Sequence, residues 1–452
     1  MEGACSQKSN TNSDTGDPAN ISDDSDELDE FDNCGLEAIN DACKIIYADQ
    51  PNPLQAIAVK KYWMGGPDPL DFVSMYHNEG DSTRNIPPHW HYVSYGFSDL
   101  YGDGRVHRMG SRGEASGFGF ELTFRLKREK EEEEPPLWPQ NLMNRLANYV
   151  FQTGNVLLVG DHIPWHKPLD GTTFSHVQSM LIAEDPQLFD LDTPYGIVEF
   201  RQIVGVTSDE VKAAQKWKGA GILEMLINHP QVGPFFVTDL SREKSIFDQD
   251  AGLFQLVNEG VENDGSNLGH VTAVCTWTNI SQTSEESVRT SQQLVVGDVE
   301  GASGGVPGED KENEDISPPP QLVDAVHLYF DAEAAELLPL VARARLKKGQ
   351  YFIFHNAEKE AIHFIPAQSS ADVTLMVDDA NPMVAQGTYI QILCSPSFIE
   401  EMSQEFEGLQ IIDETIANYP KEYSFSSPCV KVTVVARGTH VPVLVNDSEI
   451  LQ

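Results

Sequence analysis

The sequence predicts an α+β fold with two domains, and three observations lead to this prediction. Short apolar runs with the two-residue period of strands mix with helical patterns, and no regular strand–helix–strand repeat connects them. A length of 452 residues, 40% of them hydrophobic, is enough for about three domains or two large ones. Finally, two acidic stretches poor in aromatic residues interrupt the segments that can build a core.

The two acidic stretches define the expected limits of the domains. Residues 1–32 contain ten acidic residues and one lysine, and residues 281–320 contain nine acidic and two basic residues. Low hydrophobicity with high net charge is typical of disorder, and Gly265 and Gly269 flank a boundary between the two folded parts. The predicted divisions are a disordered tail at 1–34, a first domain at 35–267, a second domain at 268–452 and, within it, a disordered insertion at 281–320.

In the first domain, the clearest strand runs from Phe118 to Leu126, where apolar residues alternate with polar or small ones as in a half-buried strand. A helix with Pro139 in its first turn is expected next. Thr207 and Glu210 have the spacing of a capping box and predict the start of another helix. Further predicted strands are 156–159, which reads as buried and ends at Gly160-Asp161, then 197–206 and 235–237.

In the second domain, a strand over 271–277 is expected first. A helix should begin at Ser395-Pro396, because proline is favoured in the first turn and Phe398, Met402 and Phe406 then share one face. The other predicted strands are 326–330, 351–354, 389–393 and 430–435.

The charge of the chain limits its partners. A formal net charge of −40 predicts repulsion from nucleic acids and from anionic membrane surfaces, so a basic protein is the natural complement. Six scattered cysteines without a CxxC pair argue against a disulfide framework and a zinc ribbon. No apolar run reaches 18 residues, so we expect a soluble protein in a reducing intracellular compartment.

Histidine pairs are the strongest hint of metal chemistry. His89-x-His91 and His162-x-x-x-His166 could indicate zinc, but Pro164 breaks the helix that would place the second pair on one face. We favour histidines that are hydrogen-bonded in or near a core. No phosphate loop or nucleophile motif occurs, so we expect no cofactor and no enzymatic activity. A metal-dependent hydrolase and a passive acidic scaffold remain as alternatives.

Carboxylates follow two strand-like runs. Asp161 and the pair Glu184-Asp185 could bind a histidine, arginine or lysine of a partner. On spacing alone, solvated loop acids are the better interpretation.

Several motifs together resemble the Suppressor of fused family, whose members are negative regulators of Hedgehog signalling. The densest ones are Tyr62-Trp63-Met64-Gly65-Gly66-Pro67 and Pro87-Pro88-His89-Trp90-His91. Others are Asp49-Gln50-Pro51-Asn52-Pro53, Tyr149-Val150-Phe151-Gln152, Gly160-Asp161-His162, Glu184-Asp185-Pro186-Gln187, Asp264-Gly265-Ser266-Asn267-Leu268 and Pro420-Lys421-Glu422-Tyr423-Ser424. The chain looks like an invertebrate member of the family. Its insertion lacks the serine-phosphorylation cluster of vertebrate members, so we do not expect regulation by that route.

The resemblance implies two α+β domains that form a clamp. Members bind Gli/Cubitus interruptus zinc-finger transcription factors, retain them in the cytoplasm and repress them in the nucleus. A Ser-Tyr-Gly-His segment of the factor lies as a strand between the domains, and strand addition of this kind combines main-chain hydrogen bonds with side-chain pockets. The Fused kinase and other Hedgehog pathway components are further implied partners.

The same resemblance implies which residues contact the segment. Tyr149 lines a histidine pocket, and Asp161 and Glu184 face the segment from the first domain. Leu346 packs against its apolar side. Main-chain groups of the second domain complete the implied site, at Val271, Thr272 and Ala273.

Overall fold

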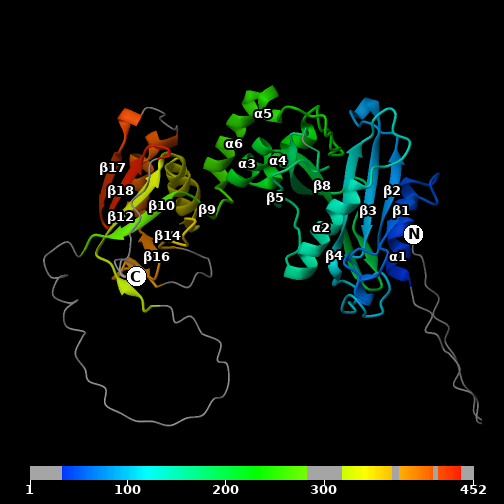
Figure 1. Cartoon of the computed structure of the whole chain (residues 1–452), viewed down its shortest axis with the longest axis horizontal. Helices are drawn as coiled ribbons and strands as arrows, with labels where there is room; N and C mark the ends of the chain where they lie inside the picture. The colour runs from blue at the N-terminus through cyan, green and yellow to red at the C-terminus, as the bar shows by residue number, and fades with distance from the viewer. Residues whose placement is uncertain (1–32, 173, 282–317, 369–375, 411–415, 439–452) are drawn as a thin grey trace, which may run out of the picture.

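A computed structural model confirms the predicted class of fold, with mixed helices and sheets in both halves of the chain (Figure 1). The predicted tail at 1–34 and insertion at 281–320 lie almost entirely outside the described residues. The structure describes residues 33–172, 174–281, 318–368, 376–410 and 416–438.

The strands of the first half form one sheet. They are β1 (Leu54–Ile57), β2 (Phe72–Asn78), β3 (His89–Tyr95), β4 (Ala115–Lys127), β5 (His162–Pro164), β6 (Val177–Glu184), β7 (Leu191–Thr193) and β8 (Gly196–Thr207). Their order is β1-β2-β3-β4-β8-β6-β5, with β7 also on β8. Only the β4–β8 pair among them is parallel. β1 and β5 are therefore the two edges of this sheet.

Helices cover both faces of the first sheet. Apolar residues of α2 (Trp138–Thr153) pack with Phe120, Leu122 and Phe124 of β4, whereas α1 (Cys34–Ile46) packs on the opposite face. The predicted half-buried strand is therefore buried on both faces, and even Arg125 has no exposed surface. The remaining helices of this half are α3 (Ser208–Lys216), α4 (Gly219–Asn228), α5 (Ile246–Gln249) and α6 (Ala251–Asp264), with short 3₁₀ turns at Tyr62–Met64 and Ser82–Arg84.

The capping box predicted before α3 is confirmed. The Glu210 carboxylate accepts from the Thr207 amide over 2.9 Å, which is the bond that such a box forms back to the residue before the helix. Glu210 is fully buried and also forms an ion pair with Arg242. The first turn of α3 is therefore stabilised by the bond to Thr207 and by the ion pair with Arg242.

From His270 on, the described residues form two more sheets. The strands are β9 (His270–Thr272), β10 (Cys275–Asn279), β11 (Gln321–Leu322), β12 (Ala325–Asp331), β13 (Phe352–His355), β14 (Ala361–Pro366), β15 (Met383–Gln386), β16 (Tyr389–Cys394), β17 (Lys421–Ser426) and β18 (Cys429–Val435). One sheet has the order β10-β12-β18-β17 and the other β11-β15-β16-β14-β13-β9. β9 is thus an edge strand.

Short helices connect these two sheets. They are α8 (Ala332–Ala335), α9 (Leu338–Leu340), a π-helix at Val341–Arg345, a 3₁₀ turn at Leu346–Lys348, α10 (Pro396–Glu405) and 3₁₀ turns at Glu407–Gln410 and Ile416–Asn418. The helix predicted at Ser395-Pro396 is confirmed as α10, with the Ser395 hydroxyl accepting from the Phe398 amide.

Three predicted strands differ from the structure. The segment 271–277 is divided between β9 and β10, which belong to different sheets. The segment 235–237 forms turns, and the segment 156–159 is not a strand. In the latter, only Leu157 is buried, so the expectation of a buried strand there is wrong.

The two halves meet at α6 and the π-helix. Leu340 and Ala344 belong to the same apolar cluster as Val257 and Val261 of α6. The amide of Ser266 donates to the Ala344 carbonyl over 3.0 Å, and Arg345 donates to the Ser266 carbonyl over 2.6 Å. The connecting segment is therefore bound to the second half. The exact division at residue 268 stays a prediction.

Among the described residues, no helix is both long and apolar enough to cross a membrane.

Candidate functional site

A groove of about 970 Å³ lies between α3 of the first half and β9 with α8 of the second half. Lys212, Gln215 and Lys216 line one side, and the implied site residues Val271, Thr272 and Ala273 line the other. β9 lies toward the middle of the molecule, near the α3–α6 helices (Figure 1). The groove is thus built by segments from both halves, and one wall is an edge strand.

The free edge of β9 presents main-chain groups in a defined pattern. β9 pairs in parallel with β13, where the Ile353 amide donates to Gly269 and the Ala273 amide donates to His355. In a parallel pair of strands, the main-chain N–H and C=O groups of alternate residues point toward the partner strand and away from it. The main-chain N–H and C=O of Val271 therefore face β13, whereas those of His270 and Thr272 face away from the sheet. The outward main-chain groups of β9 thus belong to His270 and Thr272, whereas Val271 and the Ala273 amide bond β13, and the implied contacts of these residues with a ligand stay a prediction.

The groove has charges of both signs on opposite walls. Two lysines, Lys212 and Lys216, come from α3. The wall from the second half is acidic, and burial raises the pKa of one of its members, Asp331. The acidic side chains are Asp331, Glu333, Glu336, Glu358 and Glu360. Such a wall attracts a histidine, lysine or arginine of a ligand.

A second surface holds the implied site residues of the first half. Asp161 precedes the edge strand β5 and Glu184 ends the adjacent strand β6. The side chain of Asp161 accepts from the Leu158 amide over 2.7 Å, which shapes the turn before β5. Tyr149 is 46% exposed on α2, and its hydroxyl accepts from the side chain of Asn155 over 3.3 Å. Segment 155–160 therefore contacts Tyr149 and Asp161, and its Leu157 carbonyl accepts from Arg201, the residue of β8 that lies opposite Glu184.

Exposed apolar side chains accompany this second surface. Val156, Leu158 and Val159 are 36%, 51% and 43% exposed. The sequence pattern placed them in a core, since four successive apolar residues do not distinguish a buried strand from an exposed loop. Clustered exposed apolar groups next to carboxylates are typical of a binding surface.

The loop that carries Glu184 is anchored by a buried ion pair. Asp185 follows Glu184 directly, and its carboxylate accepts from Arg125 over 2.5 and 3.0 Å, and from Thr123 over 2.7 Å. The side chains of Asp185 and Arg125 are fully buried. Asp185 is therefore not the solvated loop acid that spacing alone favoured. Burial by itself would raise the pKa of Asp185, but the Arg125 charge and the hydrogen bonds from His91 and Arg125 hold that pKa well below its usual range.

His91 completes this network as a neutral imidazole. Burial, together with the charge of Arg125, lowers the pKa of His91 to about 4. Nε2 lies 3.2 Å from Asp185 and Nδ1 lies 2.8 Å from the Tyr47 hydroxyl. In a neutral ring, the Nε2 proton is donated to Asp185 and the Tyr47 hydroxyl donates to Nδ1.

Acid should destabilise the fold through His91. The pKa of this group is lower in the folded state than the usual 6.5, so the unfolded chain binds its proton first as the pH falls from 6.5 towards 4. The free energy of unfolding should therefore fall in that window, by about 2 kcal/mol between pH 7 and pH 5. Urea unfolding of the unchanged chain and of a His91→Gln variant at several pH values measures the part of this decrease that is due to His91. An identical pH dependence of both proteins would contradict it.

The four histidines of the metal hypothesis do not converge. His89 and His91 lie on β3, whereas His162 lies on β5, and three strands separate β3 from β5. At about 4.8 Å per strand, that places the pairs roughly 19 Å apart. Nδ1 of His89 lies 2.8 Å from the Pro87 carbonyl. His89 and His91 thus match the favoured interpretation of hydrogen-bonded core residues, and the described residues contain no group of three or more metal-binding side chains.

Leu346 lies elsewhere. Its side chain is 2% exposed and belongs to the core of the second half. Its implied contact with a bound segment would therefore require a different conformation.

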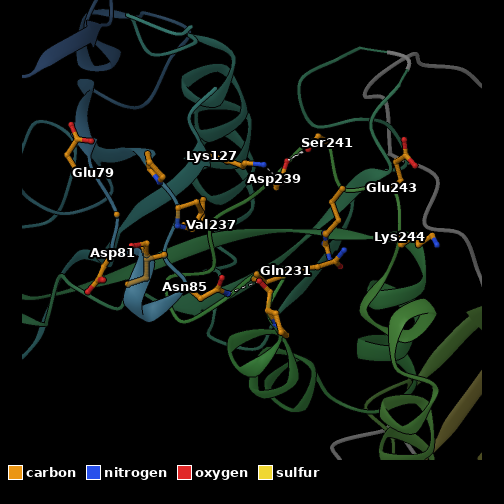
Figure 2. A pocket seen from close by; sticks show the side chains of 18 residues that line it. Glu79, Asp81, Asn85, Lys127, Gln231, Val237, Asp239, Ser241, Glu243 and Lys244 are labelled. Carbon is orange, nitrogen blue, oxygen red and sulfur yellow. Dashed lines mark hydrogen bonds and ion pairs between the residues drawn. The ribbon is translucent and has the colours of Figure 1, made fainter. Parts of the chain in front are cut away.

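A second cavity, of about 1140 Å³, lies in the first half between the 79–88 and 230–244 segments. Figure 2 shows Lys127 beside Asp239 at its rim. Lys127 and Arg242 are both held in ion pairs within the protein. The residues implied by the family resemblance do not line this cavity, and it is the weaker candidate.

Comparisons with known proteins come from three directions. Residues 66–243 match the family described as Suppressor of fused protein, and residues 255–434 match the Suppressor of Fused Gli/Ci N terminal binding domain. The Suppressor of fused homologs of Homo sapiens and Mus musculus are each 40% identical over 449 residues, covering 89% of this chain and 91% of theirs. The crystal structure of Drosophila Suppressor of Fused superposes with a TM-score of 0.70 at 33% identity, covering 89% of this chain and 97% of the other.

Proposed function

Because this chain belongs to the Suppressor of fused family and is a regulator of Hedgehog signalling, we propose that it binds Gli/Cubitus interruptus zinc-finger transcription factors. A Ser-Tyr-Gly-His segment of the factor is held as a strand between the two halves. Binding retains the factor in the cytoplasm and represses its activity, also in the nucleus. The protein acts by binding and not by catalysis.

The observation that carries this proposal is the free edge of β9 in the groove. The main-chain groups of His270 and Thr272 point away from β13, so an extended segment can add to the sheet there. Exposed edges of this kind are normally protected in soluble proteins. β5, one of the two edges of the first sheet, offers a second place for an extended segment.

Charge supports a ligand that contains histidine. The second-half wall of the groove is acidic, and Asp161 and Glu184 add carboxylates beside the exposed apolar segment 156–159. A histidine that leaves water needs a hydrogen-bonding or charged partner. We propose that Asp161 and Glu184 supply it, that Tyr149 provides the aromatic wall, and that Thr272 provides main-chain hydrogen bonds.

Replacing Thr272 by proline should weaken binding of a Ser-Tyr-Gly-His peptide by roughly tenfold. Proline removes an outward main-chain N–H and leaves the main-chain bonds to β13 intact, which edge strands tolerate, while only the bond between the Thr272 hydroxyl and His355 is also lost. Titration calorimetry measures the affinity, with a scrambled peptide as the ligand control. Val271→Pro is the matched variant, because its N–H faces β13 and its loss should reduce stability.

Equal affinity of the Thr272→Pro protein and the unchanged protein would contradict strand addition at β9. Peptide binding that is independent of sequence and lost at moderate salt would instead favour the passive acidic scaffold.

Two further partner predictions follow from the family. We propose that the chain also binds the Fused kinase, which co-precipitation of the two purified proteins would test. We expect no direct binding to nucleic acid or membranes, because of the net charge of −40.

A further inference from the structure

The Tyr62–Met64 motif has no part in the proposed binding site, and it lies in an unusual surface. In a chain with a net charge of −40, basic and aromatic residues gather beside it, and two of these cations, Lys61 and Arg105, pair with Asp71 and Asp103. We call this surface the basic face. It consists of Lys60, Lys61, Trp63, Arg105, Arg108 and Met109.

Side-chain contacts join the two loops of the basic face. The Arg105 guanidinium lies 4.4 Å from the centre of the Trp63 ring and 5.9 Å from that of Tyr101. The carboxylate of Asp71 accepts from the Tyr101 hydroxyl over 2.7 Å and pairs with Lys61 over 3.2 Å. Lys61, Trp63 and Arg105 are therefore connected, and Lys60, Arg108 and Met109 adjoin them along the two loops.

The basic face has the composition of an interface. Trp63 is 45% and Met109 63% exposed, and large exposed apolar groups among arginines are enriched where proteins bind. Lys60 and Arg108 are exposed, and no carboxylate of the described residues lies within ion-pair distance of either. These two charges are available to an anionic ligand.

The start of the described chain lies beside the basic face. The Leu36 amide donates to the Leu100 carbonyl over 3.1 Å. Leu100 lines a small cavity together with Trp63 and Arg105. A chain that continues outward from α1 thus begins next to these residues.

The sequence before α1 is complementary to the basic face. Residues 23–32 read Asp-Asp-Ser-Asp-Glu-Leu-Asp-Glu-Phe-Asp, with seven acidic residues and two large apolar ones, Leu28 and Phe31. Phe31 is three residues and Leu28 six residues before Cys34, so their reach is about 10 and 20 Å. A short tether also keeps the effective concentration near the millimolar range, so weak contacts suffice.

We propose that residues 23–32 dock on the basic face of their own chain. Acidic side chains of this segment bind Lys60 and Arg108, and Leu28 and Phe31 contact Trp63 and Met109. An acidic partner protein would then reach the basic face only by displacing the segment.

Hydrogen exchange of the full chain and of a chain lacking residues 1–32 tests this proposal. Deletion should speed amide exchange in segments 60–66 and 104–113 by on the order of tenfold and leave the remaining sheet unchanged. High salt should have the same effect on the full chain, because salt screens exposed charges. Lys60→Glu with Arg108→Glu should reproduce the deletion, whereas the control Lys130→Glu, at an exposed lysine away from the face, should not.

Two results would overturn the proposal. One is equal exchange of both segments with and without residues 1–32. The other is protection that disappears on dilution of the full chain, since that would identify a second copy as the occupant.

Discussion

Replacing Asp185 by alanine should lower the free energy of unfolding by about 3–5 kcal/mol. The substitution leaves the fully buried guanidinium of Arg125 without its counterion and removes the acceptor for Thr123 and His91. It also removes the carboxylate that accepts from the amides of Gln187 and Leu188, so the loop after Glu184 loses its anchor. The expected loss is a large fraction of the stability of an ordinary domain.

Urea unfolding followed by fluorescence measures this effect. Asp190→Ala is the matched control, because Asp190 is an exposed acid five residues further along the chain. A double variant, Asp185→Leu with Arg125→Met, should recover much of the loss, since apolar residues can replace a buried ion pair. A loss below about 1 kcal/mol for Asp185→Ala, the usual value of a surface pair, would contradict this account.

The second large effect concerns binding. Glu184→Arg should reduce the affinity for a Ser-Tyr-Gly-His peptide by roughly a hundredfold, which is about 3 kcal/mol. Reversal of the charge replaces attraction of the peptide histidine by repulsion next to the apolar segment 156–159. Because Glu184 is exposed, its side chain contributes little to the fold, and unfolding should be nearly unchanged.

The substitution at Asp161 has to separate the effect of charge from an effect on the local turn. Its side chain accepts from the Leu158 amide, so Asp161→Arg changes both the charge and the turn. Asp161→Asn keeps an acceptor and removes only the charge, and Glu184→Gln is the equivalent control at the other position. Calorimetry should rank both neutral variants between the unchanged protein and the arginine variants. Unchanged affinity in Glu184→Arg would remove this surface from the proposed site.

Local patterns predicted much of the secondary structure. The alternation over 118–126, the capping box at Thr207 and the helix at Ser395-Pro396 each arise from neighbours along the chain, and the structure contains all three. The segments 156–159 and 271–277 were misread because burial depends on residues far away in sequence. In the first case no element of the described residues covers the loop, and in the second the chain passes between sheets at Ala273-Val274.

The candidate site was predicted only in part. Val271, Thr272 and Ala273 do line the groove, but Lys212 and Lys216 on the opposite wall could not be foreseen. They come from a helix of the first half, and no sequence spacing relates them to β9. The same holds for Asp185, since its partner Arg125 is 60 residues away.

The sequence by itself determined the family, the class of fold, the acidic charge and most strands and helices, because composition, motifs and short-range periodicity carry that information. Only the tertiary structure decided which main-chain groups of β9 face outward, that segment 156–159 is exposed, and that Asp185 is buried against Arg125. These properties depend on packing and strand pairing between distant segments. The physical reason is that burial and hydrogen bonding depend on neighbours in space, and patterns along one sequence do not show which distant residues become neighbours.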